Sequence, residues 1–380
     1  MKEFAEGKSR SPNWIFIKAA VLMLFVLGQA RAQELVEQSL RIPMREAGSQ
    51  GLEAVMVRPN DDLAHPLVLM THGTPREADK RHEITALSFV PQAREFARRG
   101  WTTVIVVRRG YGTSGGSYAE EARACSRRPD YYLAGKESAR DLRASIDYLS
   151  GIAHVDGSRV VSVGVSTGGF ANVALTADPP PNLVAAISFA GGRGSKSPDE
   201  VCNPSELVRA FGEFGRTSHV PMLWIYAEND HFFGPELAAN FYVAFTRSGG
   251  KAEFFRPAAF GKDGHKLFSG GIPLWTPLVD DFLAAHRLKL RDELLALPTP
   301  PDVAAPSSLT GGRSLADWRN FLTFPGHRAF AVSGDGYYGY AFGRPSDKEA
   351  ETQALEHCKE FAPRGDRCEL VVIPATTAVH

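Results

Sequence analysis

One stretch of the chain decides its fold: Val160-Val161-Ser162-Val163-Gly164-Val165-Ser166-Thr167-Gly168-Gly169. It fits the pattern G-x-S-x-G, and it lies between an apolar run and residues 170–177, which can form a helix. A serine at such a strand-to-helix turn takes strained backbone angles, and only very small residues fit two positions before and after it. Gly164 and Gly168 occupy these positions. An ordinary glycine-rich turn can produce the same pattern, but the strand, turn and helix context favours Ser166 as a nucleophile.

A serine hydroxyl is a weak nucleophile at neutral pH, so it needs a base, and the base needs a carboxylate to orient it. Asp230 is the predicted carboxylate because it lies just past the apolar run 222–227, at the sheet edge where such sites form. Glu228 and Asp263 are the alternatives, and either one could instead be a solvated loop charge.

His265 is the predicted base. It ends the polar, glycine-flanked segment Gly261-Lys262-Asp263-Gly264-His265, which follows the last expected strand. The resulting order of serine, acid and histidine along the chain is one of the known orders for such triads. His231 is the alternative base, but it adjoins Asp230 in the sequence and would point away from that carboxylate in an extended loop.

The oxyanion formed by serine attack must be met by fixed hydrogen-bond donors. One is usually the backbone N–H that follows the nucleophile, here Thr167, and the other comes from the loop after the third strand. Gly73 lets the backbone approach a substrate, so the N–H of Thr74 is the predicted second donor. His72 is more simply explained as a strand-end histidine bonded to the backbone. The segment 110–116 is rich in glycine but lacks the GK[ST] pattern of a phosphate-binding loop.

Short apolar runs alternate with amphipathic segments from Glu34 to about Leu297, which is typical of an α/β fold with a mostly parallel sheet. Expected strands are 66–71, 102–107, 159–165, 183–189, 222–227 and 251–256. Expected helices cover 136–149 and begin near Ser88, Gly168, Ser205, Pro235 and Leu278. The sequence therefore predicts a sheet with helices on both faces.

Five motifs occur in the right order for a known superfamily. They are His72-Gly73-Thr74, Arg109-Gly110-Tyr111-Gly112-x-Ser114-Gly115-Gly116, Gly164-x-Ser166-x-Gly168-Gly169, Glu228-Asn229-Asp230 and Asp263-Gly264-His265. Over residues 50–290 the chain resembles the α/β-hydrolase superfamily, and most closely its dienelactone-hydrolase-like and prolyl-oligopeptidase-type branches. It departs from dienelactone hydrolases, which use a cysteine where Ser166 stands, and Ala227 replaces the usual glycine before the Glu-x-Asp motif.

The motifs and the resemblance together predict a serine hydrolase that cleaves carboxylic esters through an acyl-enzyme on Ser166. A serine peptidase of the prolyl-oligopeptidase type would share every site residue and is the first alternative. A non-catalytic binding protein on a hydrolase scaffold is the second. The expected partner is a small ester or a short peptide, and the predicted chemistry needs no metal or cofactor.

The composition sets the broad class of the protein. The 380 residues suffice for a large catalytic domain and a smaller one, and 43% hydrophobic residues can build a core. The 43 lysine and arginine residues are balanced by 43 aspartate and glutamate residues. The chain therefore lacks the excess of positive charge that would favour nucleic acid as a partner. The basic start, the apolar run 19–28 and the sequence Ala30-Arg31-Ala32 predict a signal peptide over 1–32 and export without a remaining membrane anchor. An uncleaved membrane anchor is the alternative, but the apolar run is shorter than the ~20 residues that span a bilayer.

Export changes the interpretation of the four cysteines, because an even number in an oxidising compartment favours disulfides. Cys358 and Cys368 lie close together in one C-terminal segment and are expected to pair, which leaves Cys125 with Cys202. Free buried thiols are the alternative.

The composition changes after the catalytic domain predicted for 33–297. Residues 298–314 are rich in Pro, Ala, Ser and Gly and predict a linker. Residues 315–380 predict a small ββαβ module, with a hairpin around Gly334-Asp335-Gly336 and a capping box formed by Ser346 and Glu349.

Overall fold

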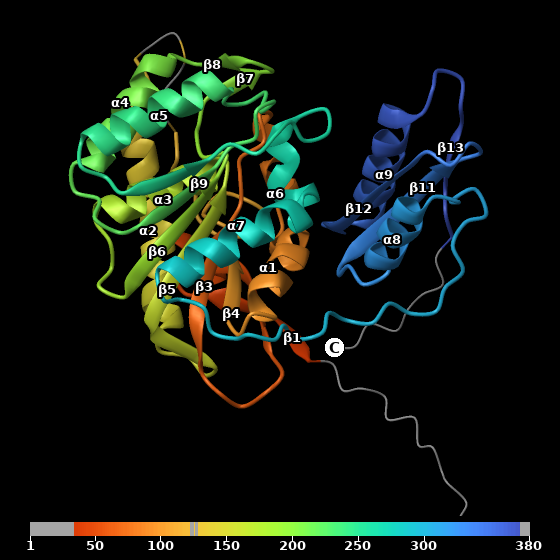
Figure 1. The fold of residues 1–380 in the computed structure, drawn as a ribbon, viewed down its shortest axis with the longest axis horizontal. Helices are drawn as coiled ribbons and strands as arrows, with labels where there is room; N and C mark the ends of the chain where they lie inside the picture. Colours follow the sequence, from red (N-terminus) through yellow and green to blue (C-terminus); the bar gives the residue numbers. More distant parts are fainter. Residues whose placement is uncertain (1–33, 122–124, 126–127, 373–380) are drawn as a thin grey trace, which may run out of the picture. The chain divides into compact units, whose positions relative to one another are not determined.

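The computed structural model describes residues 34–121, 125 and 128–372. Its largest sheet has eight strands in the order β1-β2-β4-β3-β5-β6-β9-β10 (Figure 1). The strands are β1 (Leu35–Ile42), β2 (Leu52–Pro59), β3 (His65–Thr71), β4 (Thr102–Val106), β5 (Val155–Val165), β6 (Leu183–Phe189), β9 (Met222–Ile225) and β10 (Ala252–Phe255). β2 is antiparallel to both of its neighbours, and all the other adjacent strands are parallel. The predicted α/β fold class is confirmed.

Helices cover both faces of this sheet, as Figure 1 shows. One face carries α2 (Tyr131–Leu149), α3 (Thr167–Ala177), α4 (Pro204–Gly215) and α5 (Pro235–Arg247), and the other carries α1 (Val90–Ala97), α6 (Leu267–Gly270) and α7 (Ile272–Ala285). In β3 the side chains alternate between the two cores: Leu67 and Leu69 pack on the α3 side, and Val68 and Met70 on the α1 side. A strand buried on both faces is a continuous apolar run for this reason.

Several short elements lie at the edges of these layers. They are the 3-10 helices η1 (Arg45–Gln50), η2 (Ala78–Glu83), η3 (Ala86–Phe89) and η4 (Gly264–Lys266), and the two-stranded ribbon of β7 (Ser195–Ser197) and β8 (Glu200–Val201). The helix expected from Leu278 in fact begins at Ile272, with Pro273 in its first turn, where a proline is tolerated.

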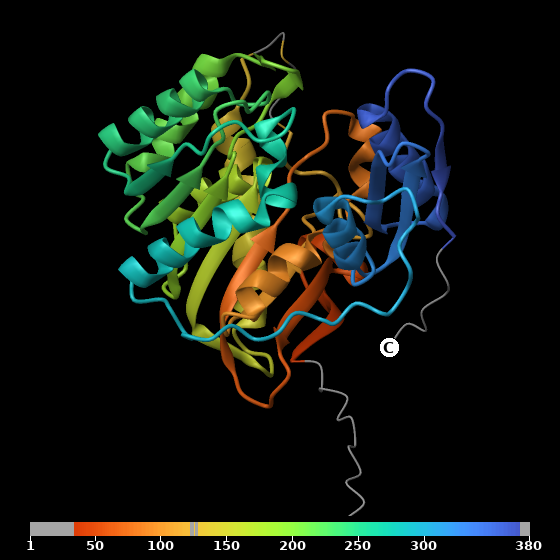
Figure 2. The same ribbon diagram turned by 45° about the vertical axis from the view of Figure 1, so that its right-hand side comes forward.

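The chain has no helix or strand from 286 to 311, a stretch that lies entirely within the described residues and that Figure 2 draws as a long extended segment. α8 (Gly312–Phe321) begins before the end of the predicted linker. It is followed by β11 (His327–Ser333), β12 (Tyr338–Arg344), α9 (Asp347–Phe361) and β13 (Cys368–Leu370). The expected ββαβ module is present, and α8 precedes it as an unpredicted helix.

The C-terminal module has cores of its own on the two faces of its antiparallel sheet, which has the order β12-β11-β13. A disulfide joins Cys358 of α9 to Cys368 of β13. Polar contacts connect the module to the larger sheet domain: Arg94 Nη2 donates to Thr323 O at 2.9 Å, and Lys262 Nζ donates to Glu360 O at 2.7 Å.

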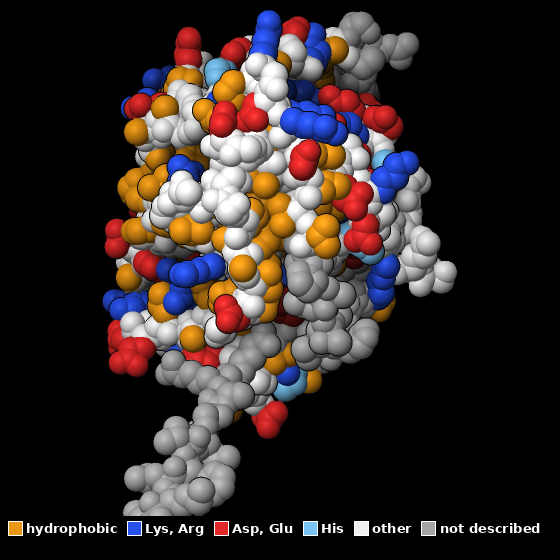
Figure 3. All heavy atoms as spheres, turned by 90° about the vertical axis from the view of Figure 1, so that its right-hand side faces the viewer, with side chains coloured by type: hydrophobic (Ala, Val, Ile, Leu, Met, Phe, Trp, Pro, Cys, Tyr) orange, Lys and Arg blue, Asp and Glu red, His pale blue; other side chains and the backbone are white. Residues whose placement is uncertain are grey.

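Charged side chains of both signs are interspersed on the face shown in Figure 3, around hydrophobic side chains gathered towards its centre. Within the described residues, no helix has the length and apolarity that crossing a membrane requires. The predicted signal peptide, 1–32, lies outside the described residues.

Candidate active site

Ser166 stands at the turn between β5 and α3. Its backbone has φ 57° and ψ −121°, a conformation that costs energy for any residue with a side chain and that clusters at functional sites. The turn is tight enough to require its two glycines. A Cβ atom on Gly164 would lie 2.3 Å from Gly168 O, and one on Gly168 would lie 2.6 Å from His72 O. The local structure therefore explains the residue types of the G-x-S-x-G pattern.

Asp230 and His265 lie side by side after β9 and β10. His265 Nδ1 is 3.0 Å from Asp230 Oδ2. The carboxylate of Asp230 is buried, and its Oδ1 accepts hydrogen bonds from the amides of Phe232 and Phe233 at 2.7 and 2.8 Å. A carboxylate held by two backbone amides cannot rotate freely, so it can fix the orientation of the imidazole beside it.

The alternative acids and the alternative base have other partners. His231 Nδ1 lies 2.9 Å from Asp199 Oδ1 rather than beside Asp230. Asp263 caps η4, where its Oδ1 accepts from the amide of His265 at 2.9 Å, and Glu228 is exposed. Of the carboxylates considered from the sequence, Asp230 is the one whose side chain meets the ring of His265.

The ring of His265 is also held from its face. It stacks on Phe232 with ring centroids 3.8 Å apart and an angle of 11° between the planes. Phe232 and Ser166 line one cavity of about 240 Å³. Among the described residues the structure records no hydrogen bond between Ser166 Oγ and His265; in unliganded sites this bond is often long and forms only with substrate.

Thr74 and Thr167, the expected oxyanion donors, line the same cavity as Ser166. Their hydroxyl oxygens are 2.7 Å apart, so the loop after β3 and the start of α3 are joined next to the serine. Thr167 is the first residue of α3, and the first amides of a helix have no partner within it. For Thr74, the described part of the chain contains no recorded acceptor for the backbone N–H.

The Cys125–Cys202 disulfide contributes to the wall of this cavity. Cys202 directly follows β8, and Cys125 belongs to the connection between β4 and α2. The disulfide therefore joins two connections, each of which contributes a cysteine to the lining of the cavity that contains Ser166.

Part of the chain matches a known protein family. Residues 48–209, less than half of the chain, match the family model of the X-Pro dipeptidyl-peptidase (S15) family, and the match includes the turn that carries Ser166. The chain has the α/β-hydrolase fold. The resemblance to that superfamily seen in the sequence is confirmed.

A curated relative of this hydrolase-like chain is the quorum-quenching protein AidA of Acinetobacter baumannii, which is 28% identical over 159 residues. The match covers 42% of this chain and 46% of the relative, so the chain spans less than half the length of that protein.

Solved structures with a related fold include two esterases and a peptidase. An esterase of Pyrococcus furiosus is 14% identical, with 66% of this chain and 90% of the other covered and a TM-score of 0.46. The esterase Est2 of Thermogutta terrifontis is 17% identical, with 67% and 94% covered and a TM-score of 0.47. An acylaminoacyl peptidase is 15% identical, with 71% and 43% covered and a TM-score of 0.47. These similarities are remote and carry no information on substrate.

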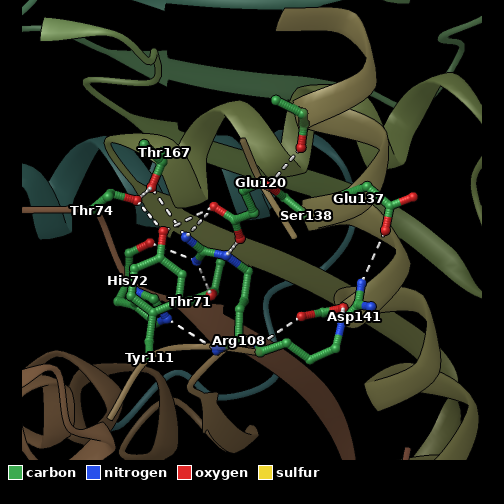
Figure 4. A network of polar contacts seen from close by, with 12 residues as sticks. Thr71, His72, Thr74, Arg108, Tyr111, Glu120, Glu137, Ser138, Asp141 and Thr167 are labelled. Carbon is green, nitrogen blue, oxygen red and sulfur yellow. Dashed lines mark hydrogen bonds and ion pairs between the residues drawn. The ribbon is translucent and has the colours of Figure 1, made fainter. Parts of the chain in front are cut away.

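A buried ionic network next to Thr74 and Thr167 was not expected from the sequence (Figure 4). Arg108, Glu120 and Arg193 are all buried, and Glu120 pairs with both arginines. Arg108 also donates to Thr167 Oγ1 at 3.1 Å. Burial by itself raises the pKa of the Glu120 carboxyl, but the charges of the two arginines outweigh this and hold that pKa well below its usual range.

The same network reaches the loop after β3. Tyr111 OH lies 2.5 Å from Thr74 Oγ1 and donates to Glu120 Oε2 at 3.1 Å. Arg108 Nη1 donates to His72 O at 2.7 Å, and the amide of Arg108 donates to His72 Nε2 at 3.0 Å. His72 is therefore a strand-end histidine bonded to the backbone. Burial, together with the charge of Arg108, holds its pKa well below the usual value.

No cluster of three or more His, Cys, Asp or Glu side chains that could hold a metal ion occurs among the described residues. The described polar side chains that line the cavity with Ser166 are hydroxyls, arginines, Lys196 and the two acids Glu120 and Glu121.

Proposed function

We propose that this chain is an exported serine hydrolase that cleaves carboxylic esters. Ser166 would be the nucleophile, His265 the general base and acid, Asp230 the carboxylate that orients the imidazole, and the amides of Thr74 and Thr167 the oxyanion donors. The observation that carries the proposal is the strained turn at Ser166, which two glycines make possible, on the same sheet edge as the buried Asp230 and the His265 beside it.

The proposed reaction has two balanced halves. Ser166 Oγ bonds to the ester carbonyl carbon while its proton passes to His265 Nε2, and the tetrahedral intermediate expels the alcohol, which takes that proton. Water then attacks the acyl-enzyme by the same route and gives its proton to His265. The carboxylic acid leaves as Ser166 recovers a proton, so one ester and one water become one acid and one alcohol.

The hydrogen bond to Asp230 determines which nitrogen of the base is available. With the Nδ1–H of His265 donating to Asp230, Nε2 carries a lone pair that can accept the proton of Ser166. The negative charge on Asp230 then stabilises the imidazolium formed during attack.

A serine peptidase is the second candidate, because the family model that matches residues 48–209 describes an X-Pro dipeptidyl-peptidase family. The two candidate activities differ in the leaving group, which is an alcohol for an esterase and an amine for a peptidase. An esterase is expected to turn over 4-nitrophenyl esters with kcat/KM well above that for aminoacyl-4-nitroanilides, and a peptidase should show high activity on the anilides as well.

The direct test of the proposed function compares 4-nitrophenyl ester hydrolysis by the wild type, Ser166→Ala and Ser117→Ala. Ser117 is an exposed serine directly after the glycine-rich segment 110–116 and serves as the matched control. We expect Ser166→Ala to lower kcat by about 10⁴-fold or more and Ser117→Ala to have no effect. Equal hydrolysis by the wild type and Ser166→Ala would refute the proposal, and inactivity of all three proteins would favour a binding protein on a hydrolase scaffold.

The proposal of export rests on the basic and apolar segment at 1–32 and on the two disulfides. Disulfides form and persist mainly in oxidising compartments, and the structure pairs Cys125 with Cys202 and Cys358 with Cys368.

A further inference from the structure

Two arginines, Arg76 and Arg81, line the cavity that contains Ser166. Both belong to the loop and 3-10 turn that follow β3, and both are half-buried. Neither is ion-paired with a carboxylate of the described residues. Among the described residues, the other two cationic side chains that line the cavity differ in this respect, because Arg193 pairs with Glu120 and Lys196 with Glu200.

Each of the two guanidinium groups lies over an aromatic ring. Arg76 Cζ is 3.6 Å from the ring centroid of Phe232, and Arg81 Cζ is 3.6 Å from that of Tyr118. Both rings line the same cavity. Stacking of this kind fixes the plane of a guanidinium. It supplies no acceptor for the N–H groups, because these bonds point outward within that plane.

Each of the two guanidinium groups has N–H donors without a hydrogen-bond partner among the described residues. Arg76 donates from Nε and Nη2 to Ser195 Oγ at 3.1 and 2.9 Å, and from Nη2 to His231 O at 3.4 Å. Its Nη1 has no recorded partner in the described part of the chain. The Nε of Arg81 is buried and likewise has no partner among the described residues.

Phe232 relates Arg76 to the base. The ring of His265 stacks on Phe232 at 3.8 Å, so it occupies one face of that ring, and the guanidinium of Arg76 at 3.6 Å must occupy the other. The Phe232 ring therefore separates the guanidinium of Arg76 from the imidazole of His265. Because Arg76 also lines the cavity that contains Ser166, its guanidinium can contact a substrate group a few bonds from the ester carbonyl.

Half-buried guanidinium groups with unused donors favour an anionic ligand, because an ionised partner forms stronger hydrogen bonds than water or a neutral carbonyl. Among the described residues of the lining, the acids are Glu120, already paired with two arginines, and Glu121, which is exposed and makes no recorded ion pair. The described part of the lining thus carries more positive than negative charge beside the serine.

We propose that Arg76 and Arg81 form a carboxylate-binding subsite, and that the substrates of this chain are esters that also carry a free carboxylate. This inference rests on the proposed function of Ser166 and specifies its substrate class. The planar forks match the two oxygens of a carboxylate, and their fixed stacking lowers the ordering cost of binding it.

The test compares two esters that differ only in charge: mono-4-nitrophenyl adipate and its neutral methyl ester. We expect the wild type to hydrolyse the anionic ester with kcat/KM about 10-fold or more above the neutral one. In Arg76→Gln/Arg81→Gln this ratio should fall towards one, and Arg76→Lys/Arg81→Lys should restore part of it. The control Arg313→Gln/Arg319→Gln removes the same charge from exposed positions of α8 and should keep the wild-type ratio.

Binding of adipate to Ser166→Ala, measured by calorimetry with and without the two Arg→Gln changes, tests the subsite without turnover. Loss of binding in the variant that lacks both arginines supports it. The subsite is refuted if the wild type hydrolyses both esters equally, or if adipate binds equally with and without the arginines. Adipate binding that depends on the arginines, without turnover of either ester, would instead refute the proposed esterase function and leave the subsite in place.

Discussion

His265 Nδ1 lies 3.0 Å from Asp230 Oδ2, and the amides of Phe232 and Phe233 hold the other carboxylate oxygen of Asp230. This arrangement orients the imidazole through a carboxylate that is itself fixed. It also distinguishes the buried Asp230 from Asp199, which pairs with His231. The side chain of Asp199 is 65% exposed and that of His231 is 41% exposed.

The role of Asp230 can be tested with Asp230→Asn, which keeps the size of the side chain and removes its charge. We expect kcat for 4-nitrophenyl esters to fall by about 10⁴-fold with the fold retained, because the imidazole loses its favoured tautomer and the charge that stabilises its protonated form. Asp199→Asn is the matched control and should leave kcat within about twofold, since exposed pairs contribute little. Similar losses in both variants would contradict the assignment of the acid.

The tight turn at the serine predicts a steric effect at Gly164. An alanine Cβ there would lie 2.3 Å from Gly168 O, so Gly164→Ala must widen the turn, and we expect a loss of about 1–3 kcal/mol in the free energy of unfolding together with a lower kcat. Gly334→Ala meets no atom within 4 Å and should change neither quantity. Chemical denaturation and ester kinetics of both variants provide the comparison, and a fully active, stable Gly164→Ala would argue against a strained nucleophile turn.

The network around Glu120 predicts how stability depends on pH. Arg108 and Arg193 lower the pKa of the Glu120 carboxyl in the folded state below its unfolded value of about 4.3. The folded state therefore binds fewer protons there, so this stabilisation is complete above about pH 5 and is lost as the pH falls towards the folded pKa. In Glu120→Gln the free energy of unfolding should be lower by about 3–5 kcal/mol at pH 7 and should fall less steeply below pH 5.

Urea denaturation between pH 7 and pH 3 measures this difference. Glu213→Gln removes a partly exposed carboxylate of α4 and should retain the wild-type acid slope. An unchanged slope in Glu120→Gln would mean that the network does not stabilise the ionised carboxylate.

The Cys125–Cys202 disulfide predicts an effect on both stability and specificity. It closes a loop with a sequence separation of 77, for which the chain-entropy estimate is roughly 4 kcal/mol. Because the bond forms part of the cavity wall, Cys125→Ala/Cys202→Ala should also change the preference among esters of different acyl length. The matched control, Cys358→Ala/Cys368→Ala, removes the disulfide of the C-terminal module and should leave that preference unchanged. Equal ester preferences in both double variants would exclude a role for the cavity disulfide in specificity.

The sequence predicts the parallel strands well because a strand buried on both faces is a continuous apolar run, as β6 and β9 illustrate. It does not predict β1 or β2, in which buried and exposed positions fail to alternate regularly. The start of β5 was missed for another reason: Asp156-Gly157-Ser158 has the composition of a turn, although it belongs to the strand. The division of the chain at 297 and 314 stays a prediction.

Local pattern also limits what could be inferred about the site. Ser166, Asp230 and His265 stand in short motifs that can be recognised one at a time. Arg108, Glu120 and Arg193 come from three separate segments and carry no motif, so their association depends on the tertiary fold. The pair formed by Arg76 and Arg81 likewise becomes visible only through the cavity that they share with Ser166.

The measurement that tests the central claim most directly is the site of covalent modification by a fluorophosphonate probe, located by peptide mass spectrometry on the folded full-length chain. The account predicts one phosphonylated peptide with the adduct on Ser166. It also predicts loss of esterase activity in proportion to labelling, and labelling slowed by about 10³-fold in His265→Ala. Labelling at a different serine with Ser166 unmodified, or an unlabelled chain that still hydrolyses esters, would contradict it.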